Sequence, residues 1–169
     1  MAGIKDVVVL SDFDGTVTTI DTAEWVLTRF ANGDWRLFDR QFEKGEITLE
    51  ECLNSQFSLV KASEKQILEE LKEIVVFRSN FKKLAMYCKE MHIPIMVVSA
   101  GLNFVINYFL EINRCADLVA VCAAKASFTD NGIKFVFPTL WERTSLNIKD
   151  DAVKRCKRHK QQVIYIGDG

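Results

Sequence analysis

Short runs of consecutive apolar residues, separated by long stretches with helical periodicity, are the feature that most constrains the fold of this chain. The runs lie at 7–10, 95–98, 118–122 and 163–166. Strands that are apolar at every position, instead of every second one, are typical of parallel sheets covered by helices on both faces. The sequence therefore predicts an α/β fold, a Rossmann-like doubly wound parallel sheet in which strands alternate with helices.

The stretch between the first two strands is helical throughout. Asp21 is placed to start one helix, Thr48 and Glu51 have the spacing of a capping box that opens another, and Ser63 begins a third. A helical stretch inserted between two strands predicts a separate cap. We expect a core of residues 1–19 and 79–169 and a cap of residues 20–78.

Composition limits the classes of function. The net charge of −1 gives no field that would attract nucleic acid or an anionic membrane, and no apolar run reaches the length of a membrane span. The basic cluster at 154–160 has no interleaved aromatic residues, so a solvated helix end is expected there. Five cysteines without a Cys-x-x-Cys pair predict buried, reduced thiols and a cytoplasmic protein.

Polar residues follow three of the predicted strands. Ligands of open parallel sheets gather beyond the carboxyl ends of the strands, so we expect these residues to meet at one edge. Lys149, from the helix before the last strand, can join them. The residues at the three strand ends are Asp12, Asp14 and Thr16 after the first, Ser99 after the second and Asp168 after the last.

These residue types suit the transfer of a phosphoryl group. An aspartate such as Asp12 can attack phosphorus, and a second carboxyl, Asp14, can protonate the leaving oxygen and then activate water. Mg²⁺ favours carboxylate oxygens, which Asp12, Asp14 and Asp168 would supply. Ser99 can donate to a phosphoryl oxygen and Lys149 can neutralise its charge.

Each residue alone also has a structural interpretation. Asp and Gly after a strand are common in turns, Ser99 can cap the following helix, and a lysine at a helix start is usually solvated. The occurrence of all of them in this order favours the catalytic interpretation.

The segments DFDGTVT, VVSAG and YIGDG, with a lysine eighteen residues before Gly167, resemble the four motifs of the haloacid dehalogenase superfamily of phosphatases. The resemblance implies that Asp12 is the nucleophile, that Asp14 is the general acid and base and that Thr16 supports their loop. It also implies that Ser99 binds the phosphoryl group and that Lys149 is the cation of the third motif. Asp168 would bind Mg²⁺ together with the Asp14 backbone carbonyl, and the helical insert would be a cap of the C1 type.

Within that superfamily the chain is most similar to the phosphoserine phosphatase-like branch. The resemblance places Asp21 and Gly101 at the substrate. Gln56 stands where the branch uses an arginine to bind the phosphoserine carboxylate, and an amide cannot form that two-pronged pair. DFDGTVT and VVSAGLNFVI are closer to the methionine-salvage phosphatases that act on 2-hydroxy-3-keto-5-methylthiopentenyl-1-phosphate.

Several alternatives stay open at this stage. The substrate is expected to be a small phosphate monoester, and a phosphotransferase would use the same residues with another acceptor. A receiver-like signalling module or an inactive phosphate-binding remnant would show no turnover. The family pattern continues past the fourth motif with another acidic residue, whereas this sequence stops at Gly169, so we expect a fragment with an exposed apolar sheet edge. Nothing in the sequence indicates the oligomeric state.

Overall fold

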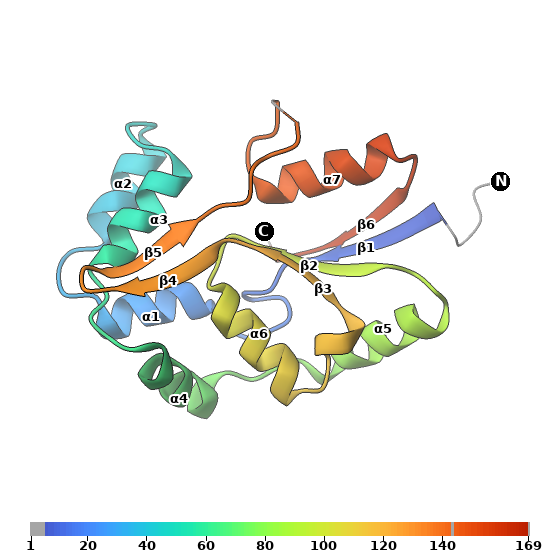
Figure 1. Cartoon of the computed structure of the whole chain (residues 1–169), viewed down its shortest axis with the longest axis horizontal. Helices are drawn as coiled ribbons and strands as arrows, with labels where there is room; N and C mark the ends of the chain where they lie inside the picture. The colour runs from blue at the N-terminus through green and yellow to red at the C-terminus, as the bar shows by residue number, and fades with distance from the viewer. Residues whose placement is uncertain (1–5, 143, 169) are drawn as a thin grey trace.

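The computed structural model describes residues 6–142 and 144–168 and contains a four-stranded parallel sheet (Figure 1). The strand order is β3-β2-β1-β6, and each neighbouring pair is parallel. The predicted α/β fold with a parallel sheet is thus confirmed. At one edge of the sheet, the β6 residue Ile164 is 51% exposed. The strands are β1 (Val7–Ser11), β2 (Ile95–Ser99), β3 (Ala120–Ala123) and β6 (Gln162–Ile166).

The two faces of the sheet are covered unequally (Figure 1). Val9 and Val97 belong to the large apolar core that includes α5 (Ser79–Glu90) and α6 (Asn103–Ile112). Their strand neighbours Val8, Leu10 and Val98 turn to the other face and pack on α7 (Ile148–Arg158). Successive side chains of a strand point to opposite faces, which explains why these strands are apolar at every position.

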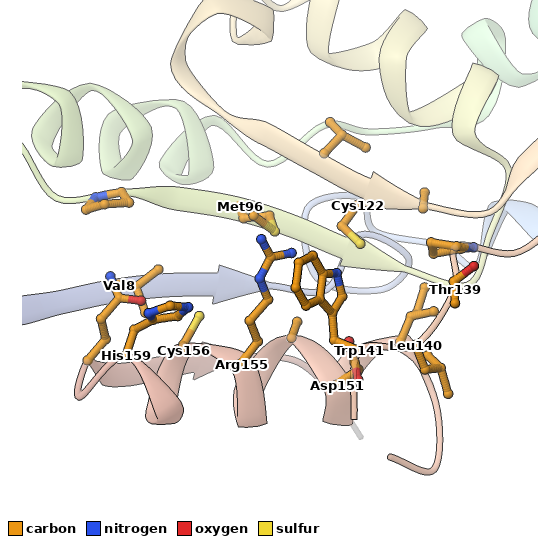
Figure 2. A pocket seen from close by; sticks show the side chains of 17 residues that line it. Val8, Met96, Cys122, Thr139, Leu140, Trp141, Asp151, Arg155, Cys156 and His159 are labelled. Atoms are coloured by element: carbon orange, nitrogen blue, oxygen red, sulfur yellow. The ribbon is translucent and has the colours of Figure 1, made fainter. Parts of the chain in front are cut away.

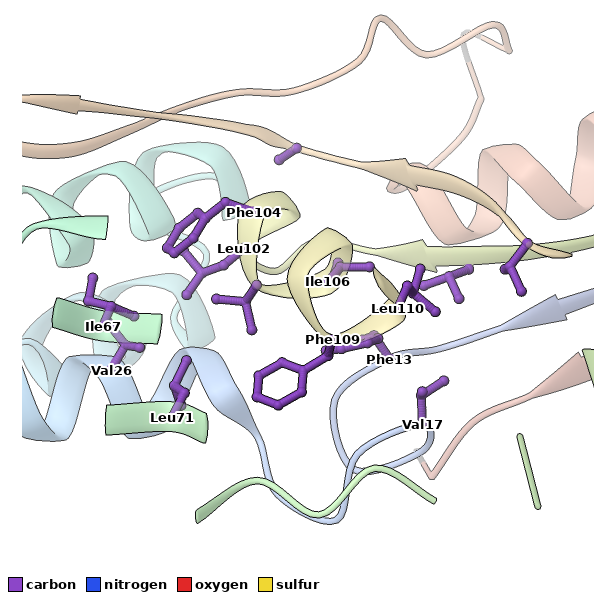
Figure 3. Packing of buried hydrophobic residues seen from close by; sticks show 14 of the residues in the cluster. Phe13, Val17, Val26, Ile67, Leu71, Leu102, Phe104, Ile106, Phe109 and Leu110 are labelled. Atoms are coloured by element: carbon purple, nitrogen blue, oxygen red, sulfur yellow. The ribbon is translucent and has the colours of Figure 1, made fainter. Parts of the chain in front are cut away.

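The inserted segment forms four helices whose starts follow from their capping residues. Asp21 accepts a hydrogen bond from the Glu24 amide, Ser63 accepts one from the Gln66 amide, and Thr48 and Glu51 form the predicted capping box. Figure 3 shows three side chains of this segment, Val26, Ile67 and Leu71, in the large core with those of α6. The helices are α1 (Thr22–Phe30), α2 (Arg36–Glu43), α3 (Leu49–Ser58) and α4 (Glu64–Ile74).

A hairpin of β4 (Lys125–Thr129) and β5 (Gly132–Val136) stands apart from the sheet and packs on the cap. The Phe135 amide donates to Asn54 Oδ1 at 2.8 Å, and the rings of Phe57 and Phe135 meet edge to face at 5.0 Å. At Gly132, with φ +99°, an added Cβ would lie 2.4 Å from the Ser58 carbonyl oxygen. Only glycine therefore allows the hairpin to approach α3 so closely.

Two boundaries differ from the sequence prediction. The third strand was predicted from residue 118, but Leu118 ends a 3₁₀ turn, where its amide donates to the Cys115 carbonyl, and β3 begins at Ala120. The hairpin turns at Asp130 and Asn131, one residue earlier than predicted, because Gly132 already pairs with Thr129.

The face under α7 is loosely filled and keeps a cavity of about 620 Å³ (Figure 2). Its walls include Met96 and Cys122 from the sheet and Cys156 from α7. The Arg155 guanidinium lies over the Trp141 ring, 4.4 Å from its centroid. None of the residues predicted for the phosphoryl site is in the described lining of this cavity.

All five cysteines are free thiols, and three of them, Cys52, Cys88 and Cys115, are buried. Burial, followed by the charge of Asp39, raises the pKa of Cys52 to about 11, so this thiol stays protonated. Across 6–142 and 144–168, no helix combines the length and the apolar character needed to cross a membrane.

Candidate active site

Asp12 lies directly after β1 and is held on three sides. Its amide donates to the Ile166 carbonyl of β6 at 2.8 Å, which fixes the start of the loop to the neighbouring strand. Its Oδ1 accepts the Phe13 amide at 2.7 Å, and its Oδ2 forms an ion pair with Lys149. The residue is only 8% exposed. The orientation of the carboxylate is therefore fixed, and its negative charge is offset by Lys149, before any ligand binds.

Lys149 reaches Asp12 from the first turn of α7. Asn147 begins this helix, and its side-chain oxygen accepts the amides of Lys149 and Asp150, both at 3.0 Å. Burial alone lowers the pKa of Lys149, but the hydrogen bond and charge of Asp12 outweigh it, so the pKa is raised above the ordinary value. Lys149 therefore stays cationic beside Asp12.

Asp14 is held by the first residue of the cap. The Thr22 amide and hydroxyl both donate to Asp14 Oδ1, at 2.8 Å and 2.6 Å. The pKa of Asp14 is raised to about 6: burial raises it most, the two hydrogen bonds from Thr22 lower it, and the charges of Asp21 and Asp12 raise it. With this pKa, both the protonated and the ionised form of the carboxyl are present near neutral pH, as is required of a group that acts as both acid and base.

Ser99 and Gly101 bring the end of β2 to the same place. Ser99 is 2% exposed, and its oxygen accepts the Gly101 amide at 3.0 Å, which leaves the hydroxyl hydrogen free to donate. A Cβ added at Gly101 would lie 2.8 Å from Asp14 Oδ2 and 3.1 Å from Ser99 Oγ. The loops after β1 and β2 thus meet at Gly101, as the sequence predicted.

Asp168 lies against the loop that carries Asp12 and Asp14. A Cβ added at Gly15, which has φ +69°, would lie 2.0 Å from Asp168 Oδ2, so only glycine leaves room for this carboxylate. Across 6–142 and 144–168, no three Asp, Glu, His or Cys side chains form a cluster that could hold a metal by themselves. The oxygens of Asp12, Asp168 and the Asp14 backbone carbonyl are a donor set that suits Mg²⁺, which binds one or two carboxylates and keeps several waters.

The other three predicted residues, Thr16, Asp21 and Gln56, differ in their burial and in their contacts. The Thr16 amide donates to the Phe13 carbonyl at 3.2 Å, within the loop it is expected to support, and its buried Oγ1 has no hydrogen-bond partner in the described chain. Asp21 caps α1 and is exposed, close enough to Asp14 to raise its pKa. Gln56 is buried between α3 and α2, where its amide donates to Asp39 Oδ1 at 2.7 Å. The contacts of Gln56 therefore join two cap helices.

Two neighbours of the site were not anticipated from the sequence. Thr22 donates to Asp14 across the loop of residues 15–21, and no periodic pattern signals such a contact. Tyr165, in β6, lies beside Lys149: burial raises the pKa of the Tyr165 phenol, Lys149 lowers it and Asp12 raises it. A tyrosine in an apolar strand gives no sign of this position, because the same residue type commonly packs in cores.

The parallel sheet and the polar edge beyond its strand ends define a class of protein: an α/β enzyme whose candidate site brings carboxylates, a lysine and a serine together. A family model described as haloacid dehalogenase-like hydrolase matches residues 9–169. The chain belongs to this family of haloacid dehalogenase-like hydrolases, and the predicted kinship is confirmed.

Known proteins agree with this assignment. The chain is 26% identical over 170 aligned residues to the 2-hydroxy-3-keto-5-methylthiopentenyl-1-phosphate phosphatase of Bacillus pumilus, an alignment covering 98% of this chain and 73% of that protein. A hydrolase of the same family from Salmonella enterica serovar Typhi has a TM-score of 0.70 at 14% identity, covering 97% of this chain and 56% of the other. A phosphoserine phosphatase, solved as an analogue of its phospho-aspartyl intermediate, has a TM-score of 0.66 at 18% identity, covering 98% and 79%. The two structures establish a likeness of fold.

Proposed function

We propose that this chain is a magnesium-dependent phosphatase that hydrolyses small phosphate monoesters through a phosphorylated Asp12. The observation that carries the proposal is the ion pair between Asp12 and Lys149, formed next to Asp14, Ser99 and Gly101 at the carboxyl edge of the sheet. A buried carboxylate paired with a cation suits a nucleophile for an anionic substrate, because the cation offsets the repulsion between the two negative groups.

In the first half of the reaction, an Asp12 oxygen forms a bond to phosphorus as the bond to the alcohol oxygen breaks. Protonated Asp14 gives its proton to the leaving oxygen, and its pKa of about 6 keeps part of it protonated near neutral pH. The Ser99 hydroxyl and the Lys149 ammonium donate to the phosphoryl oxygens and balance their charge.

In the second half, the Asp14 carboxylate takes a proton from water, and the water oxygen attacks the phosphorus of the aspartyl phosphate. The bond between phosphorus and Asp12 breaks, which releases phosphate and restores both carboxyls. Magnesium bound to Asp12, Asp168 and the Asp14 carbonyl would supply positive charge for the phosphoryl group.

Two substrates are favoured by different observations. Phosphatases named for the methylthiopentenyl phosphate of methionine salvage are among the sequence relatives, and two of them are 26% and 25% identical to this chain. Phosphoserine phosphatases share the fold. Gln56, neutral and engaged within the cap, offers no cation to a substrate carboxylate, and this supports the methionine-salvage type.

Phosphate release from p-nitrophenyl phosphate and a panel of metabolite monoesters tests the proposal. We expect turnover with Mg²⁺, loss of turnover in excess EDTA and recovery when Mg²⁺ is restored. Addition of alcohol acceptors separates hydrolysis from phosphotransfer, since only a transferase forms a new ester in proportion to the alcohol. A folded protein that releases no phosphate from any monoester with Mg²⁺ present would refute the proposal.

A further inference from the structure

A small cavity borders the phosphoryl site between cap and core. Its volume is about 240 Å³, and it is lined by cap residues 48–50, by Ala100 and by the segment that leads from β5 into α7. Ala100 lies between Ser99 and Gly101, and the lining residue Ile148 directly precedes Lys149. Two of its walls are therefore chain neighbours of the groups that would hold the phosphoryl group.

The side chains of this cavity are mainly apolar. Leu49 contributes from the cap, and Phe137, Leu140 and Leu146 contribute from the segment before α7. Leu146 is 87% exposed, an unusual position for a leucine beside a catalytic edge. Covering exposed apolar surface releases water and is favourable, so an apolar group seated here would be stabilised.

Two polar residues in the cavity wall, Thr48 and Asn147, already have hydrogen-bond partners. Thr48 caps α3 and exchanges hydrogen bonds with Glu51, and the Asn147 oxygen accepts two amides of α7. The described lining contains no lysine, arginine or histidine, and its exposed acidic residue, Glu50, is negative. Among the described lining residues there is thus no cation for a carboxylate, and Glu50 would repel one.

We propose that this cavity receives the alcohol part of the substrate and selects a phosphate monoester with an uncharged, apolar tail over phosphoamino acids. Leu49 and Leu146 are the specificity-determining residues, one from each side of the cavity. This inference rests on the proposed phosphatase function, which fixes the phosphoryl group at Asp12 and directs the alcohol oxygen toward Asp14.

Calorimetric titration with ethylphosphonate and hexylphosphonate, two non-hydrolysable analogues, tests the cavity without requiring turnover. In the presence of Mg²⁺, we expect hexylphosphonate to bind about 10-fold to 100-fold more tightly, because its four additional methylenes enter the cavity. Leu146→Asp should remove most of this preference. Leu37→Asp, at a 45% exposed leucine of α2 outside the lining, is the matched control and should keep it.

Equal affinities for the two phosphonates in the wild type, or an unchanged preference in folded Leu146→Asp, would overturn the inference. Turnover of p-nitrophenyl phosphate and of the metabolite monoester panel by the same wild-type sample reports on the proposed function. Turnover without a chain-length preference refutes the cavity assignment alone, whereas a preference without turnover supports the cavity and refutes the phosphatase.

Discussion

The catalytic edge of the core and the cap region above it are built on different principles. At the edge, a few polar side chains are fixed by hydrogen bonds and an ion pair within loops directly after strands, as for Asp12 and Ser99. In the cap, apolar packing dominates: Phe57 is fully buried against the hairpin that follows β3. Under the proposed function, the chemistry resides in the core, while the cap and the segments packed on it select the substrate.

The largest effect expected from this division is the loss of the nucleophile. Asp12→Asn keeps the shape of the side chain but removes the charge that attacks phosphorus, so kcat should fall about 10⁴-fold or more. Steady-state kinetics with p-nitrophenyl phosphate measure it, with circular dichroism to show that the variant is folded. Retention of even a tenth of the activity would show that another group is the nucleophile.

A truncation in the cap should act on stability instead. Phe57→Ala removes a fully buried ring that packs on Phe135, so the free energy of unfolding should fall by about 3–5 kcal/mol. Phe42→Ala, at a 41% exposed ring of α2, is the matched control and should change it by less than about 1 kcal/mol. Urea unfolding followed by circular dichroism measures both variants, and equal losses would mean that the hairpin and α3 do not depend on this ring.

Removal of the Lys149 cation at the edge of the sheet should lower the catalytic rate. Lys149→Met preserves the length of the side chain but leaves Asp12 without its partner, and kcat should fall about 10²-fold to 10³-fold. Lys154→Met is the control on the same helix, since Lys154 pairs with Asp150, outside the predicted site. Similar activities for the two variants would deny Lys149 its proposed role.

The same division explains how far the sequence could predict the molecule. Buried parallel strands are recognisable in the sequence as continuous apolar runs, and capping residues such as Thr48 mark helix starts. The sheet and the cap helices were therefore predictable. Asp12, Asp14, Ser99 and Asp168 were predictable as candidates because they directly follow strands, and the ends of parallel strands meet at one edge.

Contacts between distant segments were not predictable in this way. The hairpin could be expected from Asn131 and Gly132, but its docking on α3 depends on Phe135 meeting Phe57, which are far apart in the chain. The resemblance that placed Gln56 at the substrate contains no information on Asp39, its partner within the cap. Periodicity describes one element at a time, whereas these contacts depend on how elements pack together.

Thr22 is the residue where the two regions meet, and it gives the smallest and sharpest test. It is the first residue of the cap helix α1, yet both of its donors bind Asp14, the proposed acid and base of the core. Thr22→Val removes the hydroxyl donor and keeps the shape and the amide donor. A hydrogen bond to a charged group is worth about 1.5–3 kcal/mol, so kcat/KM should fall roughly 10-fold to 100-fold.

Thr22→Ser restores the hydroxyl and should recover most of the activity, which a loss caused by packing alone would not allow. If Thr22→Val lowers kcat/KM for p-nitrophenyl phosphate and Thr22→Ser rescues it, the cap takes part in the chemistry by orienting Asp14. If Thr22→Val leaves kcat/KM unchanged, the division between a core that reacts and a cap that selects is stricter than the two hydrogen bonds of Thr22 suggest. The cap would then be separable from the catalytic edge, and its residues would affect KM for large substrates while leaving kcat for small ones unchanged.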